Sequence, residues 1–136
     1  PALAAGCTVV LKPAPETPML GALLGELAVE AGLPAGVFNV ITSGDAATIG
    51  EALVKDPRVD SISFTGSTAT GKRIMANAAD KLSRVFLELG GKSAHIVLDD
   101  VQDFAATVGS AAGVVFHAGQ GCSTLTRLLI PRARYE

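Results

Sequence analysis

The sequence predicts an α/β fold in which a parallel β-sheet is flanked by helices and leads into the start of a second α/β domain. Short apolar runs alternate with longer stretches whose apolar residues recur at helical spacing, which is the first observation behind this prediction. The second is a break at Gly90 and Gly91, after which the alternation changes character. We therefore expect two domains, residues 1–89 and residues 90–136.

The first domain is expected to contain four strands and three helices. The strands cover residues 8–11, 37–41, 61–64 and 84–89, and the helices cover residues 17–31, 45–55 and 67–79. Thr17 and Asp45 stand where the first two helices need an N-cap, and Pro18 suits the first helical position. Gly32 ends the first helix. Strands that alternate with helices in this way typically run parallel.

The apolar positions of the three helices are expected to face inward. They are Leu20, Leu23, Leu24, Leu27, Ala28 and Ala31 on the first helix, Ile49 and Leu53 on the second, and Ile74, Met75 and Ala78 on the third. In the fourth strand Val85, Leu87 and Leu89 share one face, while Phe86 and Glu88 share the other.

The second domain is expected to open with a strand at residues 95–98. A helix capped by Asp103 follows, then a glycine-rich turn at residues 119–122 and a strand at residues 127–130. The inward positions of the helix are Phe104, Val108, Ala111, Ala112 and Val115.

Composition excludes several classes of protein. Apolar residues make up 49% of the chain and charged residues 18%, which indicates a globular protein. The net charge of −2 is spread along the chain without a basic stripe, so we expect no nucleic-acid partner. No apolar run approaches the roughly 18 residues that span a bilayer, so no membrane partner is expected either. Two distant cysteines and two isolated histidines predict no disulfide framework, no metal site and a reducing, cytoplasmic compartment.

A phosphate-binding turn is expected where the third strand meets the third helix. Gly66 and Ser67 stand at this junction, and the free amides of a helix N-terminus attract anions. Gly66, Gly71 and Lys72 also nearly match a P-loop, but Arg73 follows where a P-loop has a serine or threonine for magnesium. An ordinary strand-to-helix turn explains the glycines equally well.

Glu88 is a candidate general base. It lies near the end of an apolar strand, and a partly buried carboxylate suits proton transfer near neutral pH. The alternative is an edge glutamate that points into water or pairs with Lys92.

Cys122 is a candidate nucleophile, because flanking glycines place its thiol on a tight turn. Free amides in such a turn can stabilise the oxyanion that forms when a thiolate attacks a carbonyl group. The alternative is a small buried hydrophobic residue, and Cys7 is expected to be one. Lys12, just after the first strand, is a candidate for a ribose or phosphate contact, although a surface lysine is the ordinary alternative.

Taken together and in order, these stretches resemble the NAD(P)-dependent aldehyde dehydrogenase superfamily. The similar segments are residues 1–6, 8–13, 30–34, 64–68, 88–93 and 119–122. Glu88 and Cys122 are 34 residues apart, which agrees with the spacing in that family. The resemblance implies a Rossmann-like cofactor domain joined to the start of a catalytic domain.

The resemblance also implies a role for each candidate residue. Cys122 would add to an aldehyde to give a thiohemiacetal and then a thioester, and its backbone amide would supply half of the oxyanion hole. Glu88 would activate the water that hydrolyses the thioester. NAD or NADP would be held by Lys12, Pro13, Glu16, Phe64, Thr65, Gly66, Ser67, Leu89 and Gly90.

The sequence departs from the family pattern in two respects. Many NAD-preferring members have a glutamate three residues after the lysine, whereas this chain has Pro15 there and Glu16 one position later, so the choice between NAD and NADP stays open. The rest of the family's catalytic machinery is expected outside the chain, which predicts an inactive internal fragment of a homo-oligomeric parent, a dimer or tetramer.

Three alternative functions remain at this point. An acylating member of the superfamily would pass the thioester to coenzyme A, and such members often lack the base that Glu88 provides. A phosphate-binding NTPase-like module would need the hydroxyl that Arg73 replaces. A non-catalytic nucleotide-binding scaffold would use the same fold without a reactive Cys122.

Overall fold

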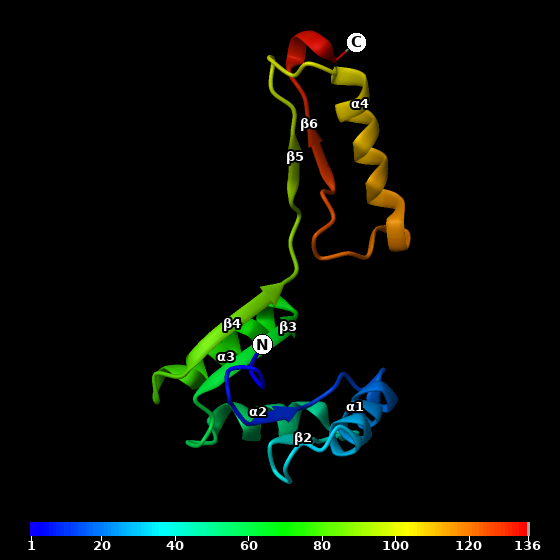
Figure 1. Ribbon diagram of the computed structural model, residues 1–136. Coiled ribbons are helices and arrows are strands. Elements are labelled where there is room, and N and C mark those ends of the chain that lie inside the picture. The colour runs from blue at the N-terminus through cyan, green and yellow to red at the C-terminus, as the bar shows by residue number, and fades with distance from the viewer. Residues whose placement is uncertain (136) are drawn as a thin grey trace. The chain divides into compact units, whose positions relative to one another are not determined.

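The computed structural model describes residues 1–135 and has the mixed α/β character that the sequence predicts (Figure 1). The strands are β1 (Val9–Leu11), β2 (Phe38–Val40), β3 (Ser61–Gly66), β4 (Arg84–Leu89), β5 (Ala94–Ile96) and β6 (Arg127–Leu129). The α-helices are α1 (Pro18–Glu30), α2 (Ala46–Lys55), α3 (Thr68–Ala79) and α4 (Phe104–Gly109). Two 3₁₀ segments follow, η1 (Ser110–Gly119) and η2 (Arg132–Arg134).

The strands pair in parallel, as predicted, and β1, β3 and β5 each pair with the strand that follows along the chain. In the described residues they form three two-stranded sheets, β1-β2, β3-β4 and β5-β6, instead of one continuous sheet. The registers begin at Val9↔Phe38, Ser61↔Arg84 and Ala94↔Arg127. A helical segment connects the two strands of each pair, which is the βαβ arrangement expected for parallel strands.

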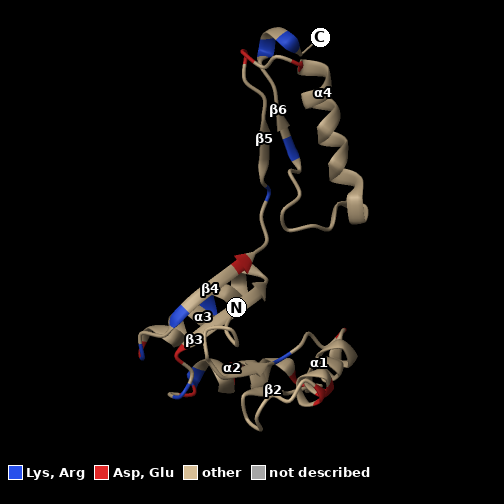
Figure 2. Ribbon diagram, viewed as in Figure 1, with Lys and Arg blue, Asp and Glu red and all other residues tan. Residues whose placement is uncertain are grey.

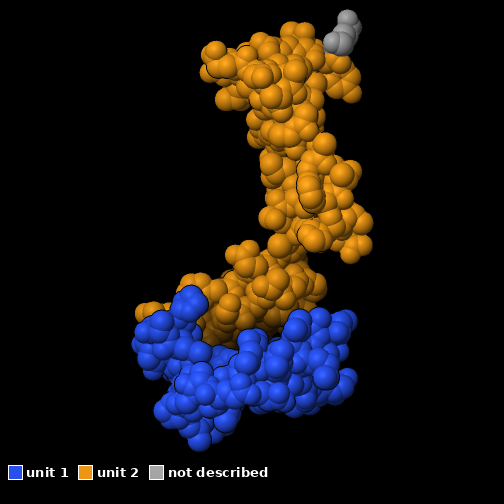
Figure 3. All heavy atoms as spheres, turned by 45° about the vertical axis from the view of Figure 1, so that its right-hand side comes forward, with its two compact units in different colours: residues 1–60, 77–83 blue, residues 61–76, 84–136 orange. Residues whose placement is uncertain are grey.

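The chain divides into two compact units (Figure 3). Unit 1 consists of residues 1–60 and 77–83, and unit 2 consists of residues 61–76 and 84–136. The predicted domain boundary after residue 89 stays a prediction.

Helix α1 of unit 1 begins at Pro18, but the predicted side-chain cap is wrong. Thr17 makes no capping hydrogen bond, because its backbone, at φ −131° and ψ 43°, leaves the capping conformation; its amide closes a turn onto the carbonyl of Ala14 at 3.0 Å. The C-terminus ends as predicted. Gly32, at φ +78°, and the residue after it donate their amides to Val29 (2.9 Å) and Ala28 (3.0 Å), which satisfies the last carbonyls.

The face of α1 that packs in unit 1 is its glycine face. A Cβ on Gly21 would lie 2.8 Å from Cγ of Pro13, and one on Gly25 would lie 3.3 Å from Cγ2 of Val40. The predicted burial of the leucine stripe is therefore wrong, because the helix turns its small residues toward the sheet. The exposed side chains are Leu20 (65%), Leu23 (48%), Leu24 (51%) and Leu27 (48%).

Helix α2 is capped by Asp45, as predicted. The amide of Thr48 donates to Oδ1 of Asp45 at 3.0 Å, and its hydroxyl donates to Oδ2 at 2.6 Å. Val54 is buried, and the predicted inward residues Ile49 and Leu53 are half-buried. The segment that follows α2 accepts hydrogen bonds from residues 77–83. One of these runs from Ser83 Oγ to the carbonyl of Val59 at 2.9 Å.

The charge of Asp45 should make the stability of α2 depend on pH. The hydrogen bonds from Thr48 lower the pKa of Asp45, so the charged cap stabilises the fold above its unfolded pKa of about 3.9 and loses this effect as the pH falls through the lowered folded value. Asp45→Asn keeps a neutral cap at every pH. We expect the melting temperature of wild type to exceed that of Asp45→Asn at pH 7 and the difference to shrink below about pH 4. A difference that is constant with pH would contradict this.

In unit 2, strand β4 has the alternation that the sequence predicts. Val85 and Leu87 are half-buried on one face, while Phe86 is 62% exposed on the other. Ile74 of α3 is buried as predicted, but Met75 is 57% exposed, so its predicted inward position is wrong. The helix packs through Gly71 and Ile74 instead, one on each of two successive turns.

Gly71 allows α3 to approach β4 closely. A Cβ there would lie 2.8 Å and 2.9 Å from the two methyl groups of Leu89, whereas Gly109 in α4 faces open space. We expect Gly71→Val to lower the free energy of unfolding by about 1–3 kcal/mol through overpacking. The matched change Gly109→Val should alter it by less than about 0.7 kcal/mol. Denaturant unfolding of both variants tests this, and equal effects would contradict it.

The last segment of unit 2 contains α4, η1 and the β5-β6 sheet. Asp103 caps α4 as predicted, accepting a hydrogen bond from the amide of Ala106 at 2.9 Å. The predicted helix continues past Gly109 as a 3₁₀ segment with three residues per turn. The half-buried positions consequently recur every third residue and fall on Val108, Ala111 and Val114.

This change of period explains which of the predicted inward residues are exposed. Phe104, Val108 and Ala111 are half-buried as predicted. Ala112 and Val115 are exposed, the latter by 72%, so their predicted burial is wrong. Val97, beside β5, is buried.

Candidate active site

The turn from β3 to α3 presents free backbone donors. Among the described residues, the amides of Ser67, Thr68 and Ala69 donate no hydrogen bond. Oγ of Ser67 accepts from the amide of Thr70 at 3.2 Å and so caps the helix. Three unpaired amides at the positive end of a helix are suited to bind an anionic group.

Gly66 lets a neighbouring side chain lie close to this turn. A Cβ on Gly66 would lie 2.5 Å from Cζ of Phe64, so the ring of Phe64 covers this glycine. Thr65 and Ser67 on either side are exposed. The P-loop interpretation is wrong, because Gly71, the second glycine of that motif, lies inside α3 and is buried against β4.

The end of β4 lies beside this turn. The parallel register places Glu88 opposite Thr65 and Leu89 opposite Gly66. The side chain of Leu89 packs on α3, and Gly90 follows in the exposed segment after the strand. The structure therefore brings the predicted base and the predicted phosphate turn to the same edge of one sheet.

Glu88 itself is exposed, so its predicted burial is wrong for this structure. Glu88 is exposed because it shares a face of β4 with Phe86, and none of the described residues cover that face. The alternative pairing with Lys92 is also wrong, since no ion pair joins these two side chains in the described part of the chain. Glu88 points to solvent with its carboxylate free.

Cys122 occupies a tight turn, as predicted. The turn is closed by the amide of Thr124, which donates to the carbonyl of Gly121 at 3.1 Å. The thiol is exposed, so the buried-hydrophobe interpretation is wrong. Within residues 1–135 the amides of Cys122 and Ser123 donate to no acceptor, which leaves donors beside the sulfur for an oxyanion.

The segment before Cys122 has an uncommon backbone. His117 and Ala118 have φ values of 49° and 55°, and Gly119 follows at 75°. Two successive non-glycine residues in the left-handed region are rare and store strain, which is frequent near functional sites. The bend ends η1 and directs the chain into the Cys122 turn.

The remaining predicted cofactor residues lie in unit 1. Lys12 is half-buried just after β1, and its Nζ donates to the carbonyl of Pro13 at 3.1 Å. Pro15 and Glu16 are the central residues of the turn closed by Thr17, and both are exposed. Cys7, expected in the core, is exposed as well, so that expectation is wrong.

Sequence reasoning missed Arg127. Its Nε donates to the carbonyl of Lys92 at 2.8 Å, and its amide donates to Ser93 at 3.3 Å. An arginine at the first position of a short apolar strand was the available signal. Thr126, just before it, buries a hydroxyl that has no hydrogen-bond partner among residues 1–135.

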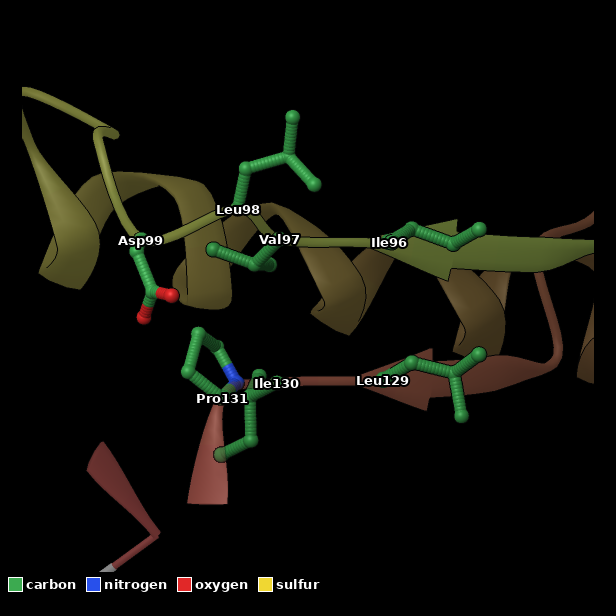
Figure 4. Close-up of a pocket in the computed structure, with 7 residues that line it drawn as sticks. All are labelled: Ile96, Val97, Leu98, Asp99, Leu129, Ile130 and Pro131. Atoms are coloured by element: carbon green, nitrogen blue, oxygen red, sulfur yellow. The ribbon is translucent and has the colours of Figure 1, made fainter. Parts of the chain in front are cut away.

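Other features of the surface do not coincide with these residues. An open hollow of about 250 Å³ lies beside the β5-β6 sheet (Figure 4). Its lining residues are Ile96, Val97, Leu98, Asp99, Leu129, Ile130 and Pro131. Charges of both signs are scattered over the ribbon (Figure 2). In the described part of the chain, no helix has the length and apolar character needed to cross a bilayer, and no group of metal-ligating side chains occurs.

The chain forms parallel βαβ units and has unpaired amides at a strand-to-helix turn. It also has an exposed cysteine on a tight turn. These features define a class of nucleotide-binding-type proteins with a candidate covalent site. The chain belongs to the aldehyde dehydrogenase family, whose sequence pattern matches residues 1–136.

Relatives of known function and structure support this assignment. A phenylacetaldehyde dehydrogenase of Pseudomonas fluorescens is 51% identical over 100% of this chain, and an NADP(+) succinate-semialdehyde dehydrogenase of Escherichia coli is 47% identical over 100%. A solved structure of a cysteine-to-alanine variant of aldehyde dehydrogenase C from Pseudomonas syringae, in complex with NAD+ and octanal, superposes with a TM-score of 0.86 at 42% identity and covers 98% of the chain. The chain spans only 27%, 28% and 27% of the lengths of these three proteins.

Proposed function

We propose that this chain is part of an NAD(P)-dependent aldehyde dehydrogenase that oxidises a small-molecule aldehyde to a carboxylic acid. The single observation that carries the proposal is the exposed thiol of Cys122 on a turn in which the amides of Cys122 and Ser123 are unpaired in the described residues. The names of the relatives, which act on phenylacetaldehyde and succinate semialdehyde, support aldehydes as the substrate class.

The residues present fit a dinucleotide. The unpaired amides of Ser67, Thr68 and Ala69 would hold its pyrophosphate, next to Phe64, Thr65 and Gly66. Leu89 and Gly90 would contact the nicotinamide side, and Leu89 would do so through its backbone because its side chain packs on α3. A bound NAD or NADP supplies the two-electron acceptor for the reaction.

In unit 1, three residues would hold the adenosine end of the cofactor. Lys12 would contact the ribose, with Pro13 and Glu16 beside it in the same loop. Pro15 and Glu16 are the central residues of the turn closed by Thr17. The position three residues after Lys12 is therefore occupied by Pro15, and the carboxylate of Glu16 comes one residue later. NAD and NADP both remain candidates, and relatives named for each are known.

The first chemical step belongs to Cys122. Its thiolate forms a bond to the carbonyl carbon of the aldehyde, and the π electrons move to oxygen, where the amide of Cys122 donates a hydrogen bond. The thiohemiacetal oxyanion then re-forms its C=O bond as the carbon loses hydride, which leaves a thioester on Cys122. The aldehyde is oxidised by two electrons in this step.

The second step belongs to Glu88. Its free carboxylate accepts a proton from water, and the resulting nucleophile adds to the thioester carbon. The carbon–sulfur bond breaks, sulfur leaves as the thiolate, and the carboxylic acid is released. The presence of this carboxylate favours hydrolysis over transfer of the acyl group to coenzyme A.

Further features of the parent protein are proposed on the same basis. We propose that residues 1–89 complete a cofactor domain and that residues 90–136 begin the catalytic domain. The parent would act in the cytoplasm as a homo-oligomer, a dimer or tetramer. The isolated chain would be inactive, because much of the substrate site would come from other parts of the protein.

Intact-mass spectrometry of the full-length protein mixed with a cofactor and a simple aldehyde tests the proposal. We expect transient acylation of Cys122 and formation of NADH or NADPH. Adding coenzyme A should not be required for turnover, and a requirement for it would favour the acylating alternative. A protein that is never acylated and produces no reduced cofactor would support the scaffold interpretation instead.

A further inference from the structure

The proposed base and nucleophile lie on segments that are far apart in the chain. Glu88 lies at the end of β4, and Cys122 lies in the turn before β6. The hydrolysis of a thioester needs these segments in a fixed relation, because small displacements of a catalytic group reduce the rate strongly. The contacts that connect the two segments therefore bear on the rate of hydrolysis.

The segment after β4 offers little constraint of its own. Gly90 and Gly91 are exposed, and a Cβ on either would meet nothing within 4 Å. Glycine has the widest backbone freedom of all residues. In the described chain, Lys92 is the first residue after β4 whose backbone is hydrogen-bonded to the segment that follows Cys122.

Arg127 makes that connection twice. Its guanidinium Nε donates to the carbonyl of Lys92 at 2.8 Å, and its amide donates to the carbonyl of Ser93 at 3.3 Å. It lies at the first register position of the β5-β6 pair, opposite Ala94. The guanidinium is a cationic donor, so the shorter bond is a charge-assisted one.

We propose that Arg127 is a positioning residue that fixes the glycine segment after Glu88 against β6 and so sets where the base lies relative to the thioester on Cys122. Arg127 touches neither of the two side chains in this role. The inference rests on the proposed function, since it concerns the hydrolytic half of that reaction.

Arg134 provides a matched control. Its Nη2 donates to the carbonyl of Asp99 at 3.0 Å, and its guanidinium lies 5.1 Å from the ring centre of Phe104. This is the same kind of bond, arginine to a backbone carbonyl, but it holds the other end of β5, away from Glu88 along the chain. Removing it should affect stability without moving the base.

The test compares Arg127→Met with Arg134→Met in the full-length protein. Rapid-mixing measurement of the reduced-cofactor burst reports acylation, and intact mass with single-turnover hydrolysis reports loss of the acyl group. We expect Arg127→Met to slow hydrolysis by roughly tenfold to a hundredfold, with accumulated acyl enzyme, while the burst rate stays within about threefold of wild type. Arg134→Met should leave both rates within about threefold.

The remaining outcomes are also decisive. Unchanged hydrolysis in Arg127→Met, or equal slowing in Arg134→Met, overturns the positioning role. If Arg127→Met does not fold, Arg127→Lys, which keeps the charge and a donor on a more flexible stem, should slow hydrolysis by roughly two- to fivefold, and no slowing overturns the proposal. A wild-type protein that never acylates Cys122 contradicts the proposed function itself.

Discussion

Replacing Cys122 by alanine is expected to abolish aldehyde oxidation in the full-length protein, with a loss of kcat on the order of 10⁴-fold or more. The thiol is the atom that forms the covalent bond to the substrate in the proposed reaction, and alanine leaves no nucleophile in the turn. The fold should be unaffected, because the Cys122 side chain is exposed and has no hydrogen-bond partner in the described residues.

The measurement is steady-state production of reduced cofactor, with the melting temperature as a check on folding. Cys7→Ala is the matched control, since it removes the other exposed thiol and should leave kcat within about twofold. Cofactor affinity should be retained in both variants. Loss of activity in Cys7→Ala, or activity above about one per cent in Cys122→Ala, would argue against the assignment of the nucleophile.

Replacing Glu88 by glutamine is expected to separate the two chemical steps. The amide cannot accept a proton from water, so thioester hydrolysis should slow by about 10²- to 10⁴-fold. Formation of the thioester should continue, because the thiol of Cys122 does not depend on a contact with Glu88 in the described structure. The variant should therefore give one equivalent of reduced cofactor and a stable acyl adduct on Cys122.

Intact mass gives the adduct directly, and a burst assay gives the stoichiometry. Glu51 of α2 is unsuited as a control because it is engaged by Asn77 at 3.2 Å, whereas Glu30, the exposed last residue of α1, can be changed to glutamine without disturbing a site. We expect Glu30→Gln to turn over normally. If Glu88→Gln hydrolysed the thioester at the wild-type rate, another group would have to be the base.

Local features of the fold were predictable from the sequence because they depend on a few neighbouring residues. Asp45 and Asp103 cap their helices as expected, and Gly32 ends α1 in the left-handed conformation. Thr17 failed as a cap because its backbone leaves the capping conformation at ψ 43°, an angle that residue preferences do not contain. The parallel pairing followed from the alternation of strands and helices.

Burial was predicted less well, because it depends on which element covers which face. The leucines of α1 have the spacing of a buried stripe, but Gly21 and Gly25 make the closer approach to the sheet. Glu88 has the setting of a buried carboxylate on a strand, yet nothing described covers its face. Spacing in a sequence specifies which residues share a face and leaves open what lies opposite it.

The candidate site was predicted as residue types and places, and the structure adds the connections between them. The register that sets Glu88 beside Thr65 follows from the pairing of β3 with β4, and the free amides at Ser67 and Cys122 follow from two turns. Arg127 was not predictable, because its partner is a backbone carbonyl 35 residues away and any residue type supplies one.

The pairing of strands that are consecutive in the chain, β1 with β2, β3 with β4 and β5 with β6, has a consequence for how the molecule is made. Each parallel pair is complete as soon as its own crossover has left the ribosome, so no strand has to wait for a distant partner. Each of the three βαβ units in the described residues is therefore expected to form as a separate step. Pulse-labelling of amide hydrogens during refolding should then find protection arising in three blocks, with Val9–Leu11 and Phe38–Val40 in one block and Arg127–Leu129 and Ala94–Ile96 in another.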